Sequence, residues 1–338
     1  MTKRNKRKFL VLFAGGTIVM ERDQEHNLLR DGGESALEKL IDEIHARFGD
    51  EAEFICKPPL FNIDSTDMWA THWQWLTREV AEGVAAGYDG FLITMGTNTL
   101  GYAASALTFS LLGIDKPVVI TGAQVPAKEL ASDARNNFIN SARVLIEKQL
   151  KGVIVVFGSR IINGCRAKKA SESALDAFVS YNSNGIGTIG VDISIKHEPF
   201  RTQRPFQPHA VFAEPVTCVT LTPGVQKDVL QLLIDAGNKG IIIRAYGTGD
   251  IPVLMHGGLK YAREKQVPVV VTTQCPDGAT MIGVNPPGQK ALDIGIIPAL
   301  DMSMEAMTTK LMWLLGQGLS LGEVKAMMKT NLAGEIAA

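Results

Sequence analysis

The stretch Phe9-Leu10-Val11-Leu12-Phe13-Ala14-Gly15-Gly16-Thr17-Ile18 decides the fold. It begins as a short apolar run, which is typical of a buried strand, and passes at once into two glycines and a threonine. The threonine hydroxyl is therefore delivered at the carboxyl end of the strand. In open parallel α/β sheets, ligands collect outside these strand ends, so Thr17 is the first candidate nucleophile.

A second hydroxyl-rich turn follows another apolar run. The run Gly90–Thr94 is a predicted strand, and it ends in Met95-Gly96-Thr97-Asn98-Thr99. If both strands belong to one parallel sheet, the two turns face one pocket. Threonine is a weak nucleophile at its own pKa, so Thr17 needs a neighbouring base and donors for a developing oxyanion. Either turn alone also fits a threonine that only caps a strand end.

A third segment supplies a candidate base. Gly164-Cys165-Arg166-Ala167-Lys168-Lys169 follows the apolar run Gly152–Phe157 and a polar turn. A lysine brought near two hydroxyls can have its pKa lowered by desolvation and then accept a proton. Taken alone, such a lysine equally fits a surface cation.

Short β-rich runs alternate with longer segments of helical period, which predicts a parallel α/β sheet. The first series of predicted strands and helices is Phe9–Phe13, Glu34–Phe48, Trp73–Ala86, Gly90–Thr94, Ala103–Leu112, Pro117–Thr121, Asn136–Leu150 and Gly152–Phe157. The pattern is lost from 180 to 212, where Gly, Pro, Asn and Arg dominate. We therefore expect a domain at 1–200, a linker at 201–215 and a second domain at 216–338.

The second domain repeats the alternation on a smaller scale. Its predicted elements are Val216–Thr220, Lys227–Ala236, Gly240–Arg244, Gly257–Lys265, Val267–Thr272, Glu305–Leu315 and Leu321–Met328. This order predicts a smaller α/β domain.

Composition limits the classes of partner. The chain has 338 residues, 46% of them hydrophobic, and 34 Lys and Arg against 35 Asp and Glu give a net charge of −1. No global field favours nucleic acid or a membrane surface, and no stretch offers the roughly 18 apolar residues of a membrane helix. The basic start at Lys3–Lys8 is interpreted as a solvated tail rather than a secretory signal. A cytoplasmic protein acting on a small molecule is expected.

The cysteines and histidines show no metal-binding pattern. Four cysteines lie far apart with no CxxC pair, and six histidines show no ligand spacing. We expect neither a structural zinc, nor a cofactor, nor a disulfide framework.

Taken together, the motifs resemble the bacterial-type L-asparaginases, closest to the cytoplasmic type I branch. The resemblance spans nearly the whole chain and rests on an ordered series: AGGTI at 14–18, DSTDM at 64–68, GTNT at 96–99, TGAQVP at 121–126, SDARNN at 132–137, GCRAKK at 164–169, LTPGV at 221–225, RAYGTG at 244–249, TQC at 273–275 and TTKL at 308–311. It implies a flavodoxin-like N-terminal domain, a smaller C-terminal α/β domain, and a homodimer or homotetramer whose active sites are completed by the neighbouring subunit.

The resemblance also implies an activity. Members hydrolyse the side-chain amide of Asn, often also of Gln, through an acyl-enzyme and without a metal. Thr17 matches the nucleophile, Thr97 the threonine that activates it or a water, and Lys169 the supporting lysine. Ser65 and Thr66 match the pair that holds the substrate α-carboxylate. The neighbouring Asp64, Gly16 and Gly96 are expected beside the substrate, with backbone amides around Gly96 and Thr97 stabilising the oxyanion.

The chain departs from the family pattern at several positions, among them Met95, where histidine is usual, and Lys168, where threonine is expected. Asn98 stands where an aspartate normally supports the lysine and contacts the substrate α-ammonium, so a negative charge is lost. No tyrosine precedes Tyr88, so the lid phenol of the family is absent, and Asn27, Leu28 and Leu29 occupy that region. Asp250 stands where many relatives carry an asparagine that reaches the adjacent subunit. We hypothesise that Asp250 replaces the lost carboxylate across the interface.

Two alternatives stay open. With Asn98 neutral, the pocket could favour an amide, lactam or ester that lacks a free α-ammonium. The fold could instead be a catalytically silent homologue that binds an amino acid. Nucleic acid is not expected, because the tRNA-handling relative carries an extra N-terminal domain, whereas this chain begins at its first strand.

Overall fold

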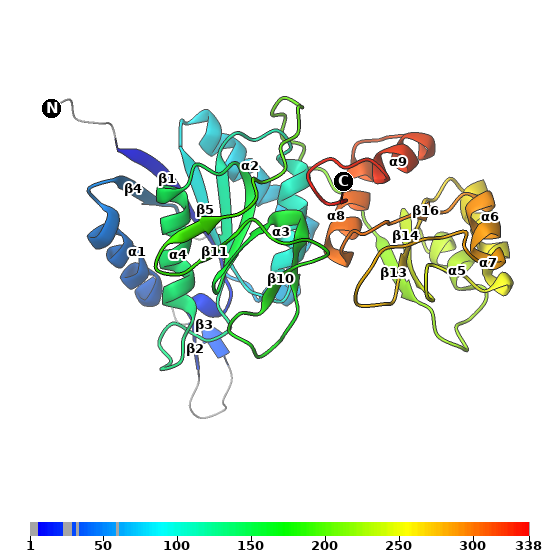
Figure 1. Cartoon of the computed structure of the whole chain (residues 1–338), viewed down its shortest axis with the longest axis horizontal. Helices are drawn as coiled ribbons and strands as arrows, with labels where there is room; N and C mark the ends of the chain where they lie inside the picture. Colours follow the sequence, from blue (N-terminus) through cyan, green and yellow to red (C-terminus); the bar gives the residue numbers. More distant parts are fainter. Residues whose placement is uncertain (1–5, 23–28, 32–33, 59–60, 338) are drawn as a thin grey trace. The chain divides into compact units, whose positions relative to one another are not determined.

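The computed structural model describes residues 6–22, 29–31, 34–58 and 61–337. The chain divides into two compact units, Met1–Pro208 and His209–Ala338 (Figure 1). This division point falls within the predicted linker at 201–215. Each unit has its own sheet and its own core.

Unit 1 is built on an eight-stranded sheet in the order β12-β11-β8-β7-β6-β5-β1-β4. The last five strands in this order are parallel, as the alternation predicts. They are β1 (Arg7–Ala14), β4 (Ala52–Cys56), β5 (Gly90–Met95), β6 (Pro117–Thr121) and β7 (Gly152–Phe157). Thr17 and Thr97 follow β1 and β5, which are hydrogen-bonded neighbours, so both turns lie at one edge of the sheet.

The other three strands extend the predicted parallel sheet with antiparallel pairs. β8 (Arg160–Asn163), β11 (Gly187–Ile189) and β12 (Ile193–Ile195) pair antiparallel. Only Gly158 and Ser159 separate β7 from β8, and Gly158 has a φ of 56°. A two-residue connection of this kind can only reverse the chain. β11 and β12 lie inside the segment predicted to lack pattern, because strands of three residues show too little alternation to be recognised.

Helices cover the sheet and bury it on both faces. They are α1 (Glu34–Phe48), α2 (Ala70–Ala85), α3 (Leu100–Ser110) and α4 (Ala134–Glu147). One core cluster joins apolar residues of α1 and α4 to β1, β4 and β7. α3 is buried along almost its whole length, which is why it shows no polar face. Short elements complete unit 1: η1 (Thr17–Val19), β2 (Met20–Arg22), β3 (Leu29–Asp31), η2 (Ser65–Asp67), η3 (Gly164–Arg166), β9 (Ala167–Lys169) and β10 (Phe178–Ser180).

Unit 2 has a parallel four-stranded sheet in the order β13-β14-β15-β16. Its strands are β13 (Val216–Thr220), β14 (Gly240–Ala245), β15 (Val269–Thr273) and β16 (Ile297–Pro298). Its helices are α5 (Val229–Asp235), η4 (Val253–Met255), α6 (His256–Glu264), α7 (Pro286–Ile294), α8 (Met304–Gly316) and α9 (Leu321–Met328). The sequence pattern missed α7, because Pro286 and Pro287 suggest a break although proline is well tolerated in the first helical turn.

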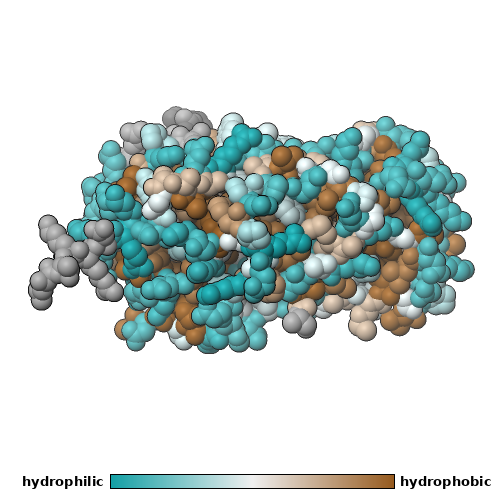
Figure 2. Space-filling view, turned by 90° about the horizontal axis from the view of Figure 1, so that it is seen from above, coloured by the Kyte–Doolittle hydropathy of each residue, from teal (hydrophilic) through white to brown (hydrophobic). Residues whose placement is uncertain are grey.

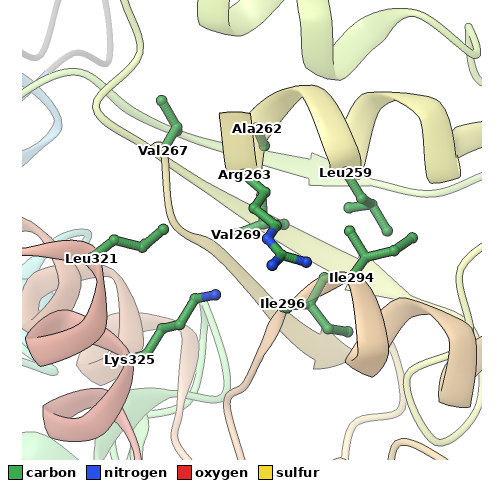
Figure 3. A pocket seen from close by; sticks show the side chains of 10 residues that line it. Leu259, Ala262, Arg263, Val267, Val269, Ile294, Ile296, Leu321 and Lys325 are labelled. Atoms are coloured by element: carbon green, nitrogen blue, oxygen red, sulfur yellow. The ribbon is translucent and has the colours of Figure 1, made fainter. Parts of the chain in front are cut away.

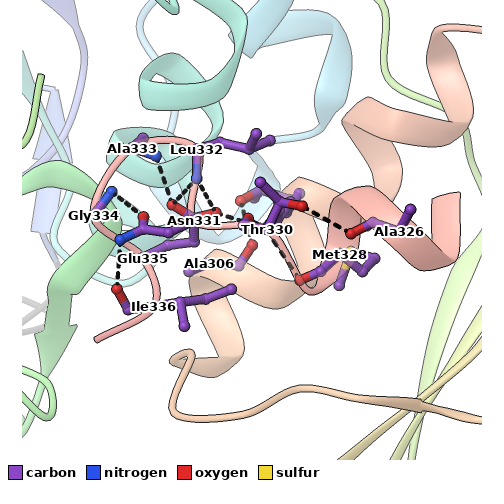
Figure 4. Close-up of polar contacts among 12 residues, drawn as sticks. Ala306, Ala326, Met328, Thr330, Asn331, Leu332, Ala333, Gly334, Glu335 and Ile336 are labelled. Atoms are coloured by element: carbon purple, nitrogen blue, oxygen red, sulfur yellow. Dashed lines mark hydrogen bonds and ion pairs between the residues drawn. The ribbon is translucent and has the colours of Figure 1, made fainter. Parts of the chain in front are cut away.

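A buried ion pair fixes the end of unit 2 (Figure 4). Lys310 on α8 and Glu335 are both fully buried, and Lys310 Nζ lies 2.6 Å from Glu335 Oε1. The same ammonium donates to the Met328 and Thr330 carbonyls at 3.1 and 2.7 Å, while the carboxylate accepts backbone N–H groups of Leu332 and Ala333. Because the Lys310 ammonium and the Glu335 carboxylate pair with each other and with backbone groups, the segment after α9 is held against α8.

The surface agrees with the balanced composition. Figure 2 shows hydrophilic and hydrophobic residues interspersed over one face of the molecule. Among the described residues, no helix is both long enough and apolar enough to cross a membrane. The same residues contain no cluster of three or more His, Cys, Asp or Glu side chains that could hold a metal ion.

Candidate active site

Three loops of unit 1 lie against one another at the carboxyl ends of β1 and β5. Gly16, with a φ of 92°, packs so closely that a β-carbon there would overlap the backbone of Gly96. A β-carbon on Gly96 would in turn lie 2.6 Å from Ser65 Oγ. Glycine is required at position 16 because it touches the Gly96 backbone, and at position 96 because the buried Ser65 side chain leaves no room for a β-carbon. The turn that carries the half-buried Thr17 therefore lies against the turn that carries Thr97.

Hydrogen bonds join the loop at 64–66 to the turn at 96–99. Ser65 is buried, and its Oγ accepts the Asn98 N–H at 3.1 Å. Asn98 Nδ2 donates to Thr66 Oγ1 at 3.0 Å, and the Thr66 N–H donates to Asp64 Oδ1 at 2.7 Å. The structure thus brings the predicted residues Ser65 and Thr66 into direct contact with Asn98, and Asp64 into contact with Thr66.

Lys169 on β9 reaches the same turn. Its ammonium donates to Thr97 Oγ1 at 2.8 Å and to Asn98 Oδ1 at 3.2 Å. Thr97, which is 6% exposed, donates its own hydroxyl proton to Gln124 Oε1 at 3.0 Å. A threonine oxygen that gives its proton to an amide and accepts from an ammonium is held in one orientation. The lysine and the threonine therefore form an oriented pair.

The surroundings of Lys169 favour its neutral form more than water does. Burial lowers the pKa of Lys169, and the negative charges of Glu172 and Asp64 oppose this by raising it. The net effect is a pKa below the ordinary value for a lysine. A lysine with a lowered pKa is able to take a proton from a hydroxyl.

Gln124 is a site residue to which the sequence assigned no role. Its Nε2 donates to the Glu172 and Ala174 carbonyls at 2.9 and 3.4 Å, which directs Oε1 toward Thr97. Its backbone N–H donates to the carboxylate of Asp133 at 3.0 Å. Gln124 belongs to the motif TGAQVP and Asp133 to the motif SDARNN. No residue spacing in the sequence indicates that an amide side chain hydrogen-bonds to Thr97.

Two family models match the chain. The family model "Asparaginase, N-terminal" matches residues 8–201, and "Glutaminase/Asparaginase C-terminal domain" matches residues 215–328. The chain belongs to the asparaginase family. Both domains of the family are present in order, and they correspond to the two series of strands and helices in the sequence.

Relatives of this asparaginase-family chain match it over most of its length. It is 33% identical to L-asparaginase 1 of Escherichia coli K12, over 98% of each protein. It is 36% identical to an L-asparaginase of Thermococcus kodakarensis, over 97% of this chain and 99% of that protein. The crystal structure of L-asparaginase I from Vibrio cholerae superimposes with a TM-score of 0.87 at 30% identity, covering 98% of this chain and 100% of that one. The fold is therefore that of the asparaginases.

Other predicted site residues of this family member lie elsewhere. Asp250 belongs to unit 2, where its Oδ2 accepts Asn285 Nδ2 at 2.6 Å. Its Oδ1 is buried and has no hydrogen-bonding partner in the described part of the chain. The role of Asp250 toward an adjacent subunit stays a prediction. Of the lid positions, Asn27 and Leu28 fall outside the described residues.

Proposed function

We propose that this protein hydrolyses the side-chain amide of Asn, and of Gln where the pocket accepts it, through an acyl-enzyme on Thr17. The observation that carries the proposal is the hydrogen bond of 2.8 Å from Lys169 Nζ to Thr97 Oγ1. The turn that carries Thr97 packs against the turn that carries Thr17. Asparaginase-family membership over both domains supports the same reaction. Ser65 and Thr66 are the proposed partners of the substrate α-carboxylate.

The proposed reaction has two halves. Thr17 Oγ attacks the amide carbon while its proton passes to the Thr97–Lys169 pair. The C–N bond then breaks, the same proton goes to the departing nitrogen, and ammonia leaves an ester on Thr17. A water next attacks the ester carbon and gives a proton to the Thr97–Lys169 pair; the ester C–O bond breaks, that proton goes to Thr17 Oγ, and the acid leaves. Backbone N–H groups around Gly96 and Thr97 are the proposed donors to the oxyanion in both halves.

The test is ammonia release by the variant Thr17→Val. We expect a loss on the order of 10³-fold or more in kcat, because no other group replaces a nucleophile. The matched control is Thr188→Val, which removes the hydroxyl of an exposed threonine on β11. Equal rates for Thr17→Val and the unaltered protein would refute the proposal. Binding of Asn by calorimetry without ammonia release would instead favour the amino-acid-binding alternative.

Asn98 favours a second candidate, hydrolysis of an amide or lactam that lacks a free α-ammonium. Its amide is uncharged, and its two ends are used by Lys169 and Thr66, so it offers no negative charge to an ammonium. Comparison of Asn with N-acetyl-asparagine separates the two candidates. A higher kcat/KM for the acetylated amide would select the second one.

We further propose a cytoplasmic homodimer or homotetramer in which Asp250 supplies a carboxylate to the neighbouring copy. The assignment rests on the position of Asp250 directly after Gly249, where many relatives carry an asparagine that reaches the adjacent subunit. Sedimentation of the full chain tests the assembly, and Asp250→Asn tests the carboxylate. Unchanged KM and kcat for Asp250→Asn would remove Asp250 from the site.

A further inference from the structure

A small pocket in unit 2 brings together two cations from different helices (Figure 3). Arg263 comes from α6 and Lys325 from α9, and Figure 3 shows both side chains directed into the pocket. The other lining residues carry no polar side chain. They are Leu259, Ala262, Val267, Val269, Ile294, Gly295, Ile296 and Leu321. The cavity has a volume of about 10 Å³, which is room for one water-sized group.

Neither cation is neutralised. Among the residues that the structure describes, the Arg263 guanidinium and the Lys325 ammonium have no hydrogen-bonding or ion-pairing partner. Burial, and then the positive charges of Arg263 and Lys329, lower the pKa of Lys325. Two like charges that converge on an apolar surface repel each other, and an isolated charge is costly to desolvate. An anion between them would remove both costs.

The backbone makes room for the lysine at this point. Gly295 ends α7 with a φ of 111°, and a β-carbon there would lie 2.7 Å from Lys325 Nζ. A residue with a β-carbon at this position would require the ammonium to shift. The carboxyl end of α7 offers the ammonium a weak negative pole, but this attraction is much smaller than that of a full negative charge.

A wider hollow adjoins the pocket and shares Arg263 and Ile294 with it. This hollow has a volume of about 590 Å³, and its other lining residues are Lys260, Glu264, Gln266 and Asp293. Asp293 already accepts Gln289 Nε2 at 2.9 Å. Arg263 therefore lies where the narrow pocket meets an open space large enough for the remainder of a small molecule.

We propose that Arg263 and Lys325 bind a small oxyanion, either inorganic phosphate or the carboxylate of a small acid. The guanidinium presents two parallel N–H donors to two oxygens of the anion, and the ammonium supplies a point charge from the opposite side. One oxygen of the anion takes the water-sized space beside the cations, and the remainder of the molecule lies in the adjoining hollow. All the residues involved belong to unit 2, and none of them takes part in the reaction proposed above.

Thermal unfolding and isothermal titration calorimetry of the full chain test the site. Inorganic phosphate and acetate are the two probes, and sodium chloride at equal ionic strength is the reference. The variants are Arg263→Gln and Lys325→Gln, each of which removes one charge without introducing another. The matched control is Lys265→Gln, since the Lys265 ammonium lies over the Tyr261 ring and lines neither hollow.

The expected result has two parts. One of the probes raises the unfolding temperature of the unaltered protein and of Lys265→Gln above the chloride reference, and both site variants bind that probe at least tenfold more weakly. In chloride alone, Lys325→Gln unfolds at a higher temperature than the unaltered protein, because repulsion is relieved. The proposal is overturned if neither probe shifts the unaltered protein, or if the site variants and the control respond equally.

Discussion

Restoring a carboxylate at position 98 is the most informative perturbation of the site. In Asn98→Asp the oxygen that lies 3.2 Å from Lys169 Nζ is kept, and the new oxygen takes the place of Asn98 Nδ2. The Thr66 hydroxyl, which accepts Asn98 Nδ2 at 3.0 Å, can rotate and donate to the carboxylate, so no polar group is left unpaired. The substitution therefore changes charge while it preserves shape.

The magnitude follows from the type of hydrogen bond. A bond to a charged partner contributes about 1.5–3 kcal/mol against about 1 kcal/mol for a neutral one, so the change is about 0.5–2 kcal/mol. For the substrate ammonium, this predicts a kcat/KM for Asn that is about 2- to 30-fold higher. For Lys169 the carboxylate favours the ammonium, so its pKa rises.

The assay is ammonia release from Asn and from N-acetyl-asparagine across the pH range. Because Lys169 acts in its neutral form, the rise of kcat/KM on the alkaline side moves to higher pH in Asn98→Asp. The gain appears for Asn and is absent for the acetylated amide, which has no ammonium. The control Asn184→Asp adds the same charge at an exposed position. The reasoning is refuted if both substrates change equally, or if the pH profile stays in place.

Two further predictions concern groups around Lys169 and Lys310. Glu172→Gln removes a negative charge that raises the pKa of Lys169, so the alkaline-side rise of kcat/KM should move to lower pH. The shift should be smaller at high salt than at low salt, because Glu172 is exposed. An unchanged profile would exclude Lys169 as the titrating base. Lys310→Met should lower the free energy of unfolding in urea by about 3–5 kcal/mol, because it leaves the Glu335 carboxylate buried without its cation. The double variant with Glu335→Gln should recover part of that loss, and an equal loss in the double variant would contradict this account.

The fold was predictable where apolar runs and helical period are long. The strands β6 and β7 and the helix α1 have the bounds that the pattern indicates. α2 begins three residues before its predicted start, because the Trp69 N–H is capped by His72 Nδ1 at 3.0 Å. A histidine in that role is not among the usual capping residues, so the sequence contains no start signal there. β15 begins after Pro268, which cannot donate to a ladder.

The site was predictable only through the ordered motifs. Thr17, Thr97 and Lys169 lie on three distant segments, and no periodicity links a residue on β9 to a turn after β5. The contact of Gly16 with Gly96 shows why the glycines are needed, but only three-dimensional packing reveals which backbone each glycine meets. Strand alternation predicts the edge of the sheet at which side chains gather, and it leaves their partners undetermined.

The segment at 172–174 determines, through Gln124, the direction in which the Thr97 hydroxyl donates its proton. The Glu172 and Ala174 carbonyls can only accept, so Gln124 must turn its Nε2 toward them and its Oε1 toward Thr97. Thr97 then has to donate to Gln124, and its oxygen is left to accept from Lys169. The Glu172 carboxylate also raises the pKa of that lysine. One short segment thus sets both the orientation of the hydroxyl and the charge of its partner, so the resting site holds Lys169 as a donor and must lose that proton before the pair can act as a base.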